Sequence, residues 1–325
     1  MAKAASISGL REFDSFFELV SFFDTEEKCS EYLALLRWNG NITCPYCSTE
    51  GGYALKGKTR RYKCRGCRRQ FGVRVGTIFE DSPISLRKWF YAVYLITSHK
   101  KGISSHQLGR DLKVTQKTAW FMLQRIRQAF APLDTLELED TVEVDETFVG
   151  GRESNKHKSK RVEGTQGRSL KTKAPVLGIL QRGGKVYAVP MEATSRETIV
   201  PIVEQKVKAG SVIYTDEYQP YKALGSTFTH LVVRHGVGEY VKGEVHTNSL
   251  EGFWSHFKRG IHGIYHHTSK WHLHLYVHEY TFRYNNRKMS EGSRFDVLLA
   301  NTEGKGITYK ALTNGNGRSR KGQAT

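Results

Sequence analysis

Four of the five cysteines in this chain of 325 residues occur in two pairs that have the same internal spacing. The pairs are Cys44-Pro-Tyr-Cys47 and Cys64-Arg-Gly-Cys67, and 16 residues separate them. A tight turn holds each pair of thiolates together, and a short hairpin can return the second pair to the first, which is the geometry that tetrahedral zinc requires. We therefore predict a zinc ribbon over residues 39–75 with one structural Zn²⁺. The protein fills all four ligand positions, so a catalytic zinc is not expected.

The net charge indicates a polyanionic partner. With 50 Lys and Arg against 32 Asp and Glu, the formal charge is +18 and the isoelectric point is about 9.6. Such an excess favours nucleic acid, because basic side chains neutralise phosphates and release counterions. On charge alone, an acidic membrane surface or the ribosome are alternatives. No apolar run approaches the roughly 20 residues that cross a bilayer, and residues 1–10 lack the apolar segment of a signal peptide. We expect a cytoplasmic protein without a membrane partner, in which the fifth cysteine, Cys29, is a small buried residue.

The N-terminal part of the chain combines helical patterns with the cysteine pairs. Apolar residues at near-helical spacing over 13–37 predict one or two short amphipathic helices within an N-terminal segment, residues 1–38. After the ribbon, two helices over 103–111 and 114–127 are separated by a short turn, which is typical of a helix-turn-helix. We predict this module at residues 83–132, with ordinary helix packing as the alternative to DNA binding.

Basic residues cluster around the second cysteine pair. They are Arg60, Arg61, Lys63, Arg65, Arg68 and Arg69. This cluster favours a ribbon that contacts DNA over one that only stabilises the fold.

The pattern becomes mixed α/β after Pro132. The expected strands are 141–149, 174–180, 185–190 and 211–215, and the expected helices are 195–208, 248–259 and 270–286. Gly183-Gly184 supplies a hairpin turn between the second and third strands. These elements predict an α/β domain over 138–300, followed by a flexible tail, 301–325. A polar insertion, 152–173, carries eight basic and two acidic residues, and long loops of this kind are usually functional or disordered.

Three carboxylates occupy positions that a metal-dependent nuclease needs. Asp145 lies inside the first expected strand, Asp216 directly follows the fourth, and Glu251 lies in the first turn of the helix after it. Carboxylates can hold two Mg²⁺ about 4 Å apart, so that the attacking and leaving oxygens of a phosphodiester are both stabilised. A single acidic residue at a strand end is more often a solvated cap. Asp145, however, interrupts an apolar strand, where an unpaired charge would be costly.

Neighbouring residues are rivals for these roles or additional members of the site. Three further acidic residues are rival metal ligands: Glu143, Glu146 and Glu217. The last two would point to the opposite face of a regular sheet. Lys258 lies two helical turns after Glu251, and it either contacts DNA phosphate beside the metal ions or is an ordinary surface lysine. Asn248, one turn before Glu251, either caps the helix or contributes an oxygen to the site.

The C-terminal helical region is rich in histidine and aromatic residues. Eight histidines between positions 246 and 278 lack a closed metal-binding pattern. A stripe with helical spacing is expected to be core rather than a base-stacking platform: Trp271, Leu275, His278 and Phe282. Four polar residues at the end of this helix either face phosphates or form a solvated helix end: Arg283, Asn285, Asn286 and Arg287.

Three strings of residues carry a family resemblance. They are Val144-Asp145-Glu146-Thr147-Phe148-Val149-Gly150-Gly151, Thr215-Asp216-Glu217-Tyr218-Gln219-Pro220-Tyr221 and His246-Thr247-Asn248-Ser249-Leu250-Glu251-Gly252-Phe253-Trp254-Ser255-His256-Phe257-Lys258-Arg259. They resemble the bacterial ISXO-like insertion-sequence transposases of the DDE class. The spacing of 35 from Asp216 to Glu251 is also similar to that class. Because this family has a zinc ribbon followed by a helix-turn-helix, the resemblance covers roughly residues 15–295.

The resemblance implies a fold and a set of roles. It implies a ribonuclease H-like core, an α/β fold with a mixed sheet, in which Asp145, Asp216 and Glu251 bind two Mg²⁺ or Mn²⁺ ions and Lys258 assists at the DNA end. Some members are described by Asn rather than Glu in the third motif, and this chain has both Asn248 and Glu251. We favour Glu251, because a carboxylate is the better ligand for a hard cation.

The sequence thus predicts a transposase that binds the terminal repeats of an insertion sequence, cleaves one strand and transfers it to target DNA. Double-stranded DNA is the expected partner, and the insertion 152–173 would grip it beside the catalytic face. By family analogy we expect a homodimer or higher assembly associated with the nucleoid in a bacterial cytoplasm. The alternatives are a zinc-ribbon DNA-binding regulator with an inactive core, and a nuclease or resolvase that cuts without joining.

Overall fold

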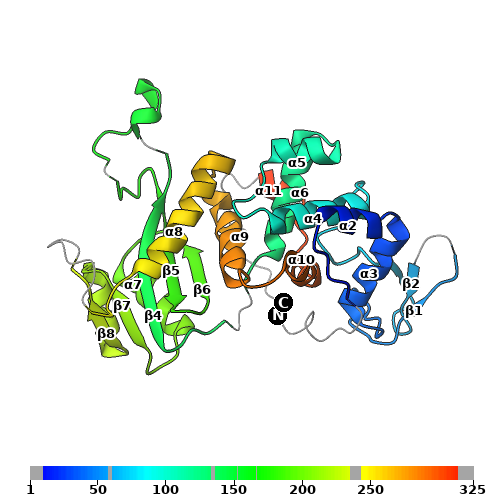
Figure 1. Cartoon of the computed structure of the whole chain (residues 1–325), viewed down its shortest axis with the longest axis horizontal. Coiled ribbons are helices and arrows are strands. Elements are labelled where there is room, and N and C mark those ends of the chain that lie inside the picture. The colour runs from blue at the N-terminus through cyan, green and yellow to red at the C-terminus, as the bar shows by residue number, and fades with distance from the viewer. Residues whose placement is uncertain are drawn as a thin grey trace. The chain divides into compact units, whose positions relative to one another are not determined.

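A computed structural model describes residues 10–57, 61–132, 136–151, 153–165, 167–234 and 243–313 (Figure 1). The chain forms two compact units. The first comprises Met1–Phe130 with Met289–Thr325, and the second comprises Ala131–Lys288. Across the described ranges, none of the helices combines the length and the apolar character that a membrane crossing requires.

The first unit is built on helices with conventional caps. Helix α2 (Phe16–Phe22) is capped by Ser15 and α3 (Glu26–Trp38) by Thr25, and α4 (Leu86–Ser98) is capped by Ser85. These side chains accept hydrogen bonds from N–H groups that the helix leaves without internal partners. One or two short helices were expected over 13–37, and the structure has two, α2 and α3. The fifth cysteine, Cys29, is fully buried in α3, as expected.

A helix that the sequence analysis did not anticipate completes this unit. Helix α10 (Glu291–Ala300) packs against α3 and α4. The buried ring of Phe295 lies 5.6 Å from that of Phe90 and 6.1 Å from that of Phe23. The predicted α/β domain extended to residue 300, whereas α10 packs with the N-terminal helices. Within the tail predicted to be flexible, α11 (Tyr309–Thr313) is helical, and residues 314–325 lie outside the described ranges.

A buried carboxyl in α10 makes the stability of this unit depend on pH. Burial raises the pKa of Asp296 to about 7, although Tyr32 Oη donates a hydrogen bond to its Oδ1 at 2.7 Å. The raised pKa means that the protonated form stabilises the folded chain, and this stabilisation is lost as the pH rises through 7. We expect the free energy of unfolding to fall by roughly 1 kcal/mol between pH 6 and pH 8 from this group. Asp296→Asn cannot ionise, so denaturant titrations should show a smaller fall in this variant; an equal fall would contradict the assignment.

The cysteine-rich segment forms a small antiparallel sheet. Its strands are β1 (Tyr53–Ala54), β2 (Arg61–Lys63) and β3 (Gln70–Gly72), in that order. The ring of Tyr62 lies 4.6 Å from that of Trp38, which comes from α3, and 5.9 Å from that of Phe71. The ribbon therefore completes its apolar core with the preceding helix.

Two helices joined by a three-residue turn follow α4. Helix α5 (Ser105–Leu112) ends at Lys113 in the left-handed conformation, and α6 (Gln116–Ala129) is capped by Thr115. The two helices pack on each other. A Cβ on Gly109 would lie 3.1 Å from Val114 O, so the glycine allows the turn to approach α5 closely. Both helices and the turn agree with the sequence analysis.

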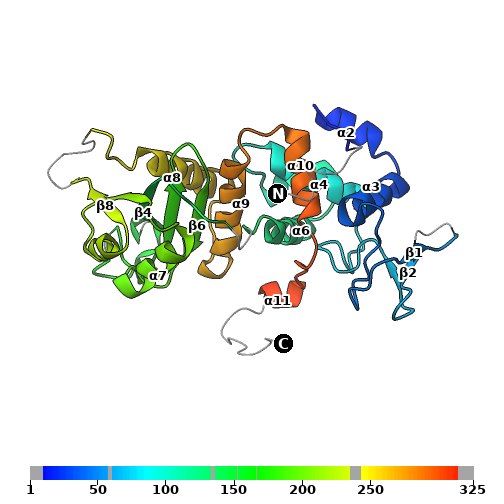
Figure 2. The same ribbon diagram turned by 90° about the horizontal axis from the view of Figure 1, so that it is seen from below.

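The second unit contains a five-stranded mixed sheet in the order β6-β5-β4-β7-β8 (Figure 1). Figure 2 shows the same sheet turned by 90°, with β8, β4 and β6 labelled. Its strands are β4 (Thr141–Val149), β5 (Ala174–Gln181), β6 (Val186–Pro190), β7 (Val212–Thr215) and β8 (Thr229–Val232). The first three form an antiparallel meander, whereas β4, β7 and β8 are parallel. This order and these directions define a ribonuclease H-like fold, as the resemblance implied. The sequence analysis missed only β8 among these five strands.

Helices cover both faces of this sheet. Helix α7 (Arg196–Lys206) packs on the face formed by Val142 and Val144. Helix α8 (Asn248–Gly260) covers the opposite face, where a Cβ on Gly178 would lie 2.5 Å from Trp254 Cζ2. The 3₁₀ helix η3 (Gln219–Ser226) joins the core beside α7, and α9 (Leu273–Asn285) packs against β6. Alternate residues of β4 therefore face different helices.

The basic insertion contains two short 3₁₀ helices, η1 (Glu153–Asn155) and η2 (Lys158–Lys160). Arg152 and Gln166 lie outside the described ranges. A Cβ on Gly150 would lie 2.8 Å from Thr172 O, so the two ends of the insertion approach each other closely at the end of β4.

One of the four residues that were expected to form a core stripe is exposed, whereas Leu275 and Phe282 are buried. Trp271, in the 3₁₀ helix η6 (Lys270–His272), is 64% exposed and is not part of the core, because α9 begins only at Leu273. The four polar side chains at the end of α9 do not all face solvent. Arg283 pairs with Glu279 at 2.7 Å, and Asn285 bonds both the N–H and the C=O of Val186 on β6.

Candidate active site and zinc centre

The four cysteines of the ribbon converge on one point. Their sulfur atoms all lie within 4.8 Å of one another. Cys44 Sγ lies 3.7 Å from Cys67 Sγ, and Cys47 Sγ lies 3.6 Å from Cys64 Sγ. A tetrahedron with Zn–S bonds of about 2.3 Å has edges of about 3.8 Å, so the four thiolates fit a structural zinc ion.

The two cysteine turns repeat the same backbone geometry. Cys44 N donates to Thr49 O and Cys64 N donates to Arg69 O, both at 3.0 Å. The residue after the second cysteine of each pair, Ser48 or Arg68, has a positive φ angle, 57° or 62°. This conformation turns the chain tightly enough to bring the two thiolates of a pair together.

The basic cluster of the ribbon is solvent-accessible where the structure describes it. Four arginines are exposed: Arg61, Arg65, Arg68 and Arg69. The guanidinium of Arg69 lies 5.2 Å above the ring of Tyr46, which is itself 48% exposed. Arg60 lies outside the described ranges.

Asp145 lies inside β4, and Asp216 directly follows β7, the parallel strand beside it. The register of β4 and β7 pairs Val142 with Ile213 and Glu143 with Tyr214. Two residues further along each strand, this register reaches Asp145 and Asp216. The sequence analysis placed Asp145 inside one strand and Asp216 directly after another. The sheet order makes these two strands neighbours.

The surroundings of Asp145 concentrate negative charge. Burial raises the pKa of Asp145 to about 7, and the charges of Glu146 and Asp216 act in the same direction. Trp254 Nε1 donates to Asp145 Oδ2 at 3.1 Å. The pair Asp145 and Asp216 fits a divalent cation, because the cation would neutralise charges that otherwise oppose each other.

Glu146 points to the other face of the sheet, as its place on the strand predicted. Its Oε2 accepts a hydrogen bond from Tyr221 Oη at 2.5 Å, and Tyr221 belongs to the core that α7 covers. Burial raises the pKa of Glu146. The guanidinium of Arg168, from the basic insertion, lies 3.7 Å from Glu146 Oε1. Among the other rivals, Glu217 is exposed and Glu143 is fully buried.

Helix α8 presents the remaining candidates on one side. Glu251 is exposed in its first turn, and its Oε1 accepts from Thr247 Oγ1 at 3.4 Å. Lys258 is exposed two turns later, and the buried Trp254 lies between them. Asn248 is the first helical residue, and the N-cap Thr247 makes no side-chain capping bond. Within the described residues, only the cysteines bring three metal-ligand atoms within 4.8 Å, so the three carboxylates do not converge this closely.

Two contributors to this region were missed by sequence reasoning. Trp254 both packs on Gly178 and bonds Asp145. Arg182, at the end of β5, pairs with Glu143 at 2.9 Å. The spacing of Trp254, three residues after Glu251, was visible in the sequence, but the contact with β4 depends on the glycine of a different strand.

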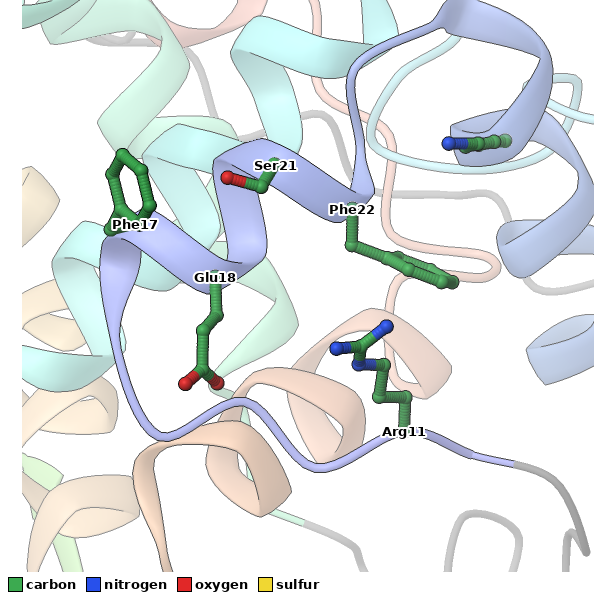
Figure 3. Close-up of a pocket in the computed structure, with 6 residues that line it drawn as sticks. Arg11, Phe17, Glu18, Ser21 and Phe22 are labelled. Carbon is green, nitrogen blue, oxygen red and sulfur yellow. The ribbon is translucent and has the colours of Figure 1, made fainter.

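A hollow on the first unit has a different character. It has a volume of about 340 Å³ and is lined by Arg11, Phe17, Glu18, Ser21, Phe22 and Lys28 (Figure 3). Phe17, expected to be part of an amphipathic helix face, is 80% exposed. The guanidinium of Arg11 lies 5.1 Å above the ring of Phe22. The hollow holds one carboxylate, so it lacks the paired carboxylates that two-metal chemistry needs.

Sequence comparison places the chain among known proteins. The model of the ISXO2-like transposase domain matches residues 137–285, and that of the transposase zinc-ribbon domain matches residues 24–70. An "uncharacterized protein in transposable element ISH50" of Halobacterium salinarum is 34% identical over 257 residues, which cover 74% of this chain and 85% of the relative. An "uncharacterized transposase-like protein" of Haemophilus influenzae is 32% identical over 118 residues, which cover 35% of this chain and 90% of the relative.

The zinc ribbon and the ribonuclease H-like sheet, together with these matches, define a protein of the transposase class. The chain belongs to the ISXO2-like transposase family. One of the two relatives is archaeal and the other is bacterial.

Proposed function

We propose that the protein is an active transposase that binds the terminal repeats of its own insertion sequence, cleaves one strand at each end and joins the freed 3′ hydroxyl to target DNA. The observation that carries this proposal is the position of two carboxylates: Asp145 lies inside β4, and Asp216 directly follows the neighbouring parallel strand β7, at the level to which the register of the two strands extends. Burial and mutual repulsion raise the pKa of Asp145 to about 7. A structural protein has no need of such a cluster, whereas phosphodiester chemistry does.

In this proposal Asp145 and Asp216 hold divalent metal, and Glu251 supplies the third carboxylate from α8. A pair of Mg²⁺ or Mn²⁺ ions, when bound, supplies activation of water or the 3′ hydroxyl and stabilisation of the leaving oxygen. Trp254 orients Asp145 through its Nε1–H. In the metal-bound site the side chain of Glu251, which is exposed and accepts a hydrogen bond from Thr247, would turn toward the two aspartates. The alternative third ligand is Asn248, which begins the same helix.

Lys258 is proposed to contact a phosphate at the DNA end. It shares a side of α8 with Glu251 and is exposed. An ammonium group there would bind phosphate as a point charge. The exposed arginines of the ribbon and the α5–α6 pair are proposed to bind the terminal repeats. By analogy with the paired-end chemistry of the family, we propose a dimer or higher assembly on DNA, associated with the nucleoid in the cytoplasm.

The test is an assay of nicking and joining with the wild-type chain. Its substrate is double-stranded DNA carrying the repeats that flank the gene, either intact or already cut at the 3′ ends. We expect products with Mg²⁺ or Mn²⁺ and none with EDTA. Binding without cutting under every metal would favour the regulator with an inactive core. Cutting without joining of the cut ends would favour a nuclease or resolvase.

The basic insertion, residues 152–173, is proposed to bind DNA beside Asp145 and Asp216. Arg168 lies beside Glu146, which follows Asp145 on β4, so the insertion reaches the strand that carries the first aspartate. We expect that replacing three exposed lysines with Ser lowers DNA affinity and reduces the dependence of log K on log salt by about 0.9 for each phosphate that is no longer neutralised. The three are Lys158, Lys160 and Lys171.

A matched variant controls for the reduced net charge. It replaces three exposed cations elsewhere in the second unit: Arg196, Lys208 and Lys222. Fluorescence anisotropy over a range of salt concentrations measures both affinity and slope. Equal slopes of log K against log salt for the two triple variants would rule out the proposed contact between the insertion and DNA.

A further inference from the structure

The first N–H groups of α8 are not capped by the N-cap side chain; the N–H of Asn248 donates to His246 Nδ1 at 3.4 Å. The N-cap residue, Thr247, makes no side-chain capping bond, although the first N–H groups of any helix lack partners within it. The N–H of Leu250, which an N-cap side chain commonly satisfies, donates instead to Glu143 Oε2 at 2.9 Å. Leu250 is fully buried, so this bond is shielded from water.

The acceptor comes from the centre of the sheet. Glu143 lies on β4 and its side chain is 0% exposed. Its other oxygen, Oε1, accepts from Arg182 Nε at 2.9 Å. A buried carboxylate requires such partners, because an uncompensated buried charge is costly. Both oxygens of Glu143 are thus engaged within the protein.

Arg182 extends the contact to the chain that leads into α8. Its Nη1 donates to Glu244 O at 2.7 Å, and its Nη2 donates to His246 O at 2.8 Å. The guanidinium also lies 4.6 Å from the centre of the Tyr214 ring on β7. A planar fork of donors can serve several acceptors at once, which an ammonium group cannot do in the same geometry.

We propose that Glu143, held by Arg182, is a positioning residue that sets the separation of the first and third carboxylates of the site. Glu143 lies two residues before Asp145 on the same face of β4, and its partner Leu250 directly precedes Glu251. The hydrogen bond therefore ties the strand that carries one ligand to the helical turn that carries the other. The negative charge of the Glu143 carboxylate at the N-terminus of α8 also stabilises that turn. This role rests on the metal-binding function proposed above.

Glutamine at position 143 cannot reproduce this contact. It preserves the size of the side chain, but it has one acceptor oxygen and an NH₂ group that would face the second donor. E143Q therefore loses the bond to either Leu250 or Arg182.

The test compares E143Q with E279Q in the full chain. Glu279 is also 0% exposed and pairs with an arginine, Arg283, at 2.7 Å, but it lies on α9. The first readout is amide hydrogen exchange of residues 248–252 without metal or DNA, and the second is calorimetric titration with Mn²⁺. We expect E143Q to exchange about tenfold faster in this turn and to bind Mn²⁺ about tenfold more weakly, and E279Q to change neither.

Wild-type exchange and wild-type Mn²⁺ affinity in E143Q would overturn the positioning role, as would equal losses in E143Q and E279Q. If E143Q does not fold, R182K replaces it, because lysine keeps the charge and loses the fork. The same two changes are expected, and their absence would overturn the proposal. Failure of the wild-type chain to bind Mn²⁺ would contradict the proposed function instead, whereas unchanged exchange in the first turn of α8 contradicts only the role of Glu143.

Discussion

Asp145→Asn and Asp216→Asn should each lower metal-dependent cleavage by about 10³-fold, which corresponds to ~4 kcal/mol of activation free energy. Each substitution replaces a charged ligand with a neutral one and weakens the hold on a divalent cation. DNA affinity should remain near that of the wild type, because neither residue belongs to the ribbon or to the α5–α6 pair. Nicking rates and anisotropy titrations on the same DNA measure the two effects separately.

The stability of the variants provides the control. Burial raises the pKa of Asp145 to about 7, so at pH 8 the ionised carboxylate opposes folding in the absence of metal. Asp145→Asn should therefore be at least as stable as the wild type at pH 8 without metal. Lost cleavage in a chain that is equally stable and still binds DNA assigns the defect to the site. Cleavage within tenfold of the wild type in either variant would contradict the proposed metal ligands.

The same assay distinguishes the two candidates for the third ligand. Glu251→Gln removes the carboxylate, whereas Asn248→Ala removes the amide one turn earlier on α8. If Glu251 is the ligand, the first variant should lose cleavage as the aspartate variants do, and the second should lose little. The opposite pattern would assign the role to Asn248.

The sequence predicted those parts of the fold that local pattern determines. Strand β4 occupies the expected residues because apolar residues alternate on both sides of Asp145. Strand β8 was missed because it is only four residues long and half-exposed, with His230 inside it. Helix α10 was recognised as an element only in the structure, since its burial depends on rings more than 190 residues earlier, such as that of Phe90.

The candidate site also has one part that the sequence could predict and one part that it could not. Asp145 and Asp216 could be proposed as neighbours because each follows or interrupts an apolar strand, and parallel strands align such positions. The bond between Glu143 and Leu250 joins residues 107 apart in the sequence, and it depends on the precise height of α8 above the sheet. That height follows from the absence of a side chain at Gly178, which lets Trp254 approach β5. No local pattern contains this information.

Removal of zinc should unfold the ribbon and leave the second unit folded. The three strands of the ribbon have two, three and three residues, which is too short for an independent sheet. Zinc binding supplies about 10–16 kcal/mol in small zinc modules, so the four thiolates provide most of the stability here. We expect one zinc per chain in the wild type and none in Cys64→Ser, as measured by elemental analysis.

Cys29→Ala is the matched control for this prediction. Cys29 is buried in α3, outside the group of four sulfur atoms, so the variant should lose some packing energy and keep its zinc. Cys64→Ser should lose affinity for the terminal repeats, because the exposed arginines of the ribbon are then no longer held together. It should retain Mn²⁺ binding, because the carboxylates belong to the separate second unit. A Cys64→Ser chain that keeps its zinc and binds the repeats normally would contradict the four-cysteine site. A chain that loses both zinc and Mn²⁺ binding would show instead that the two units fold as one.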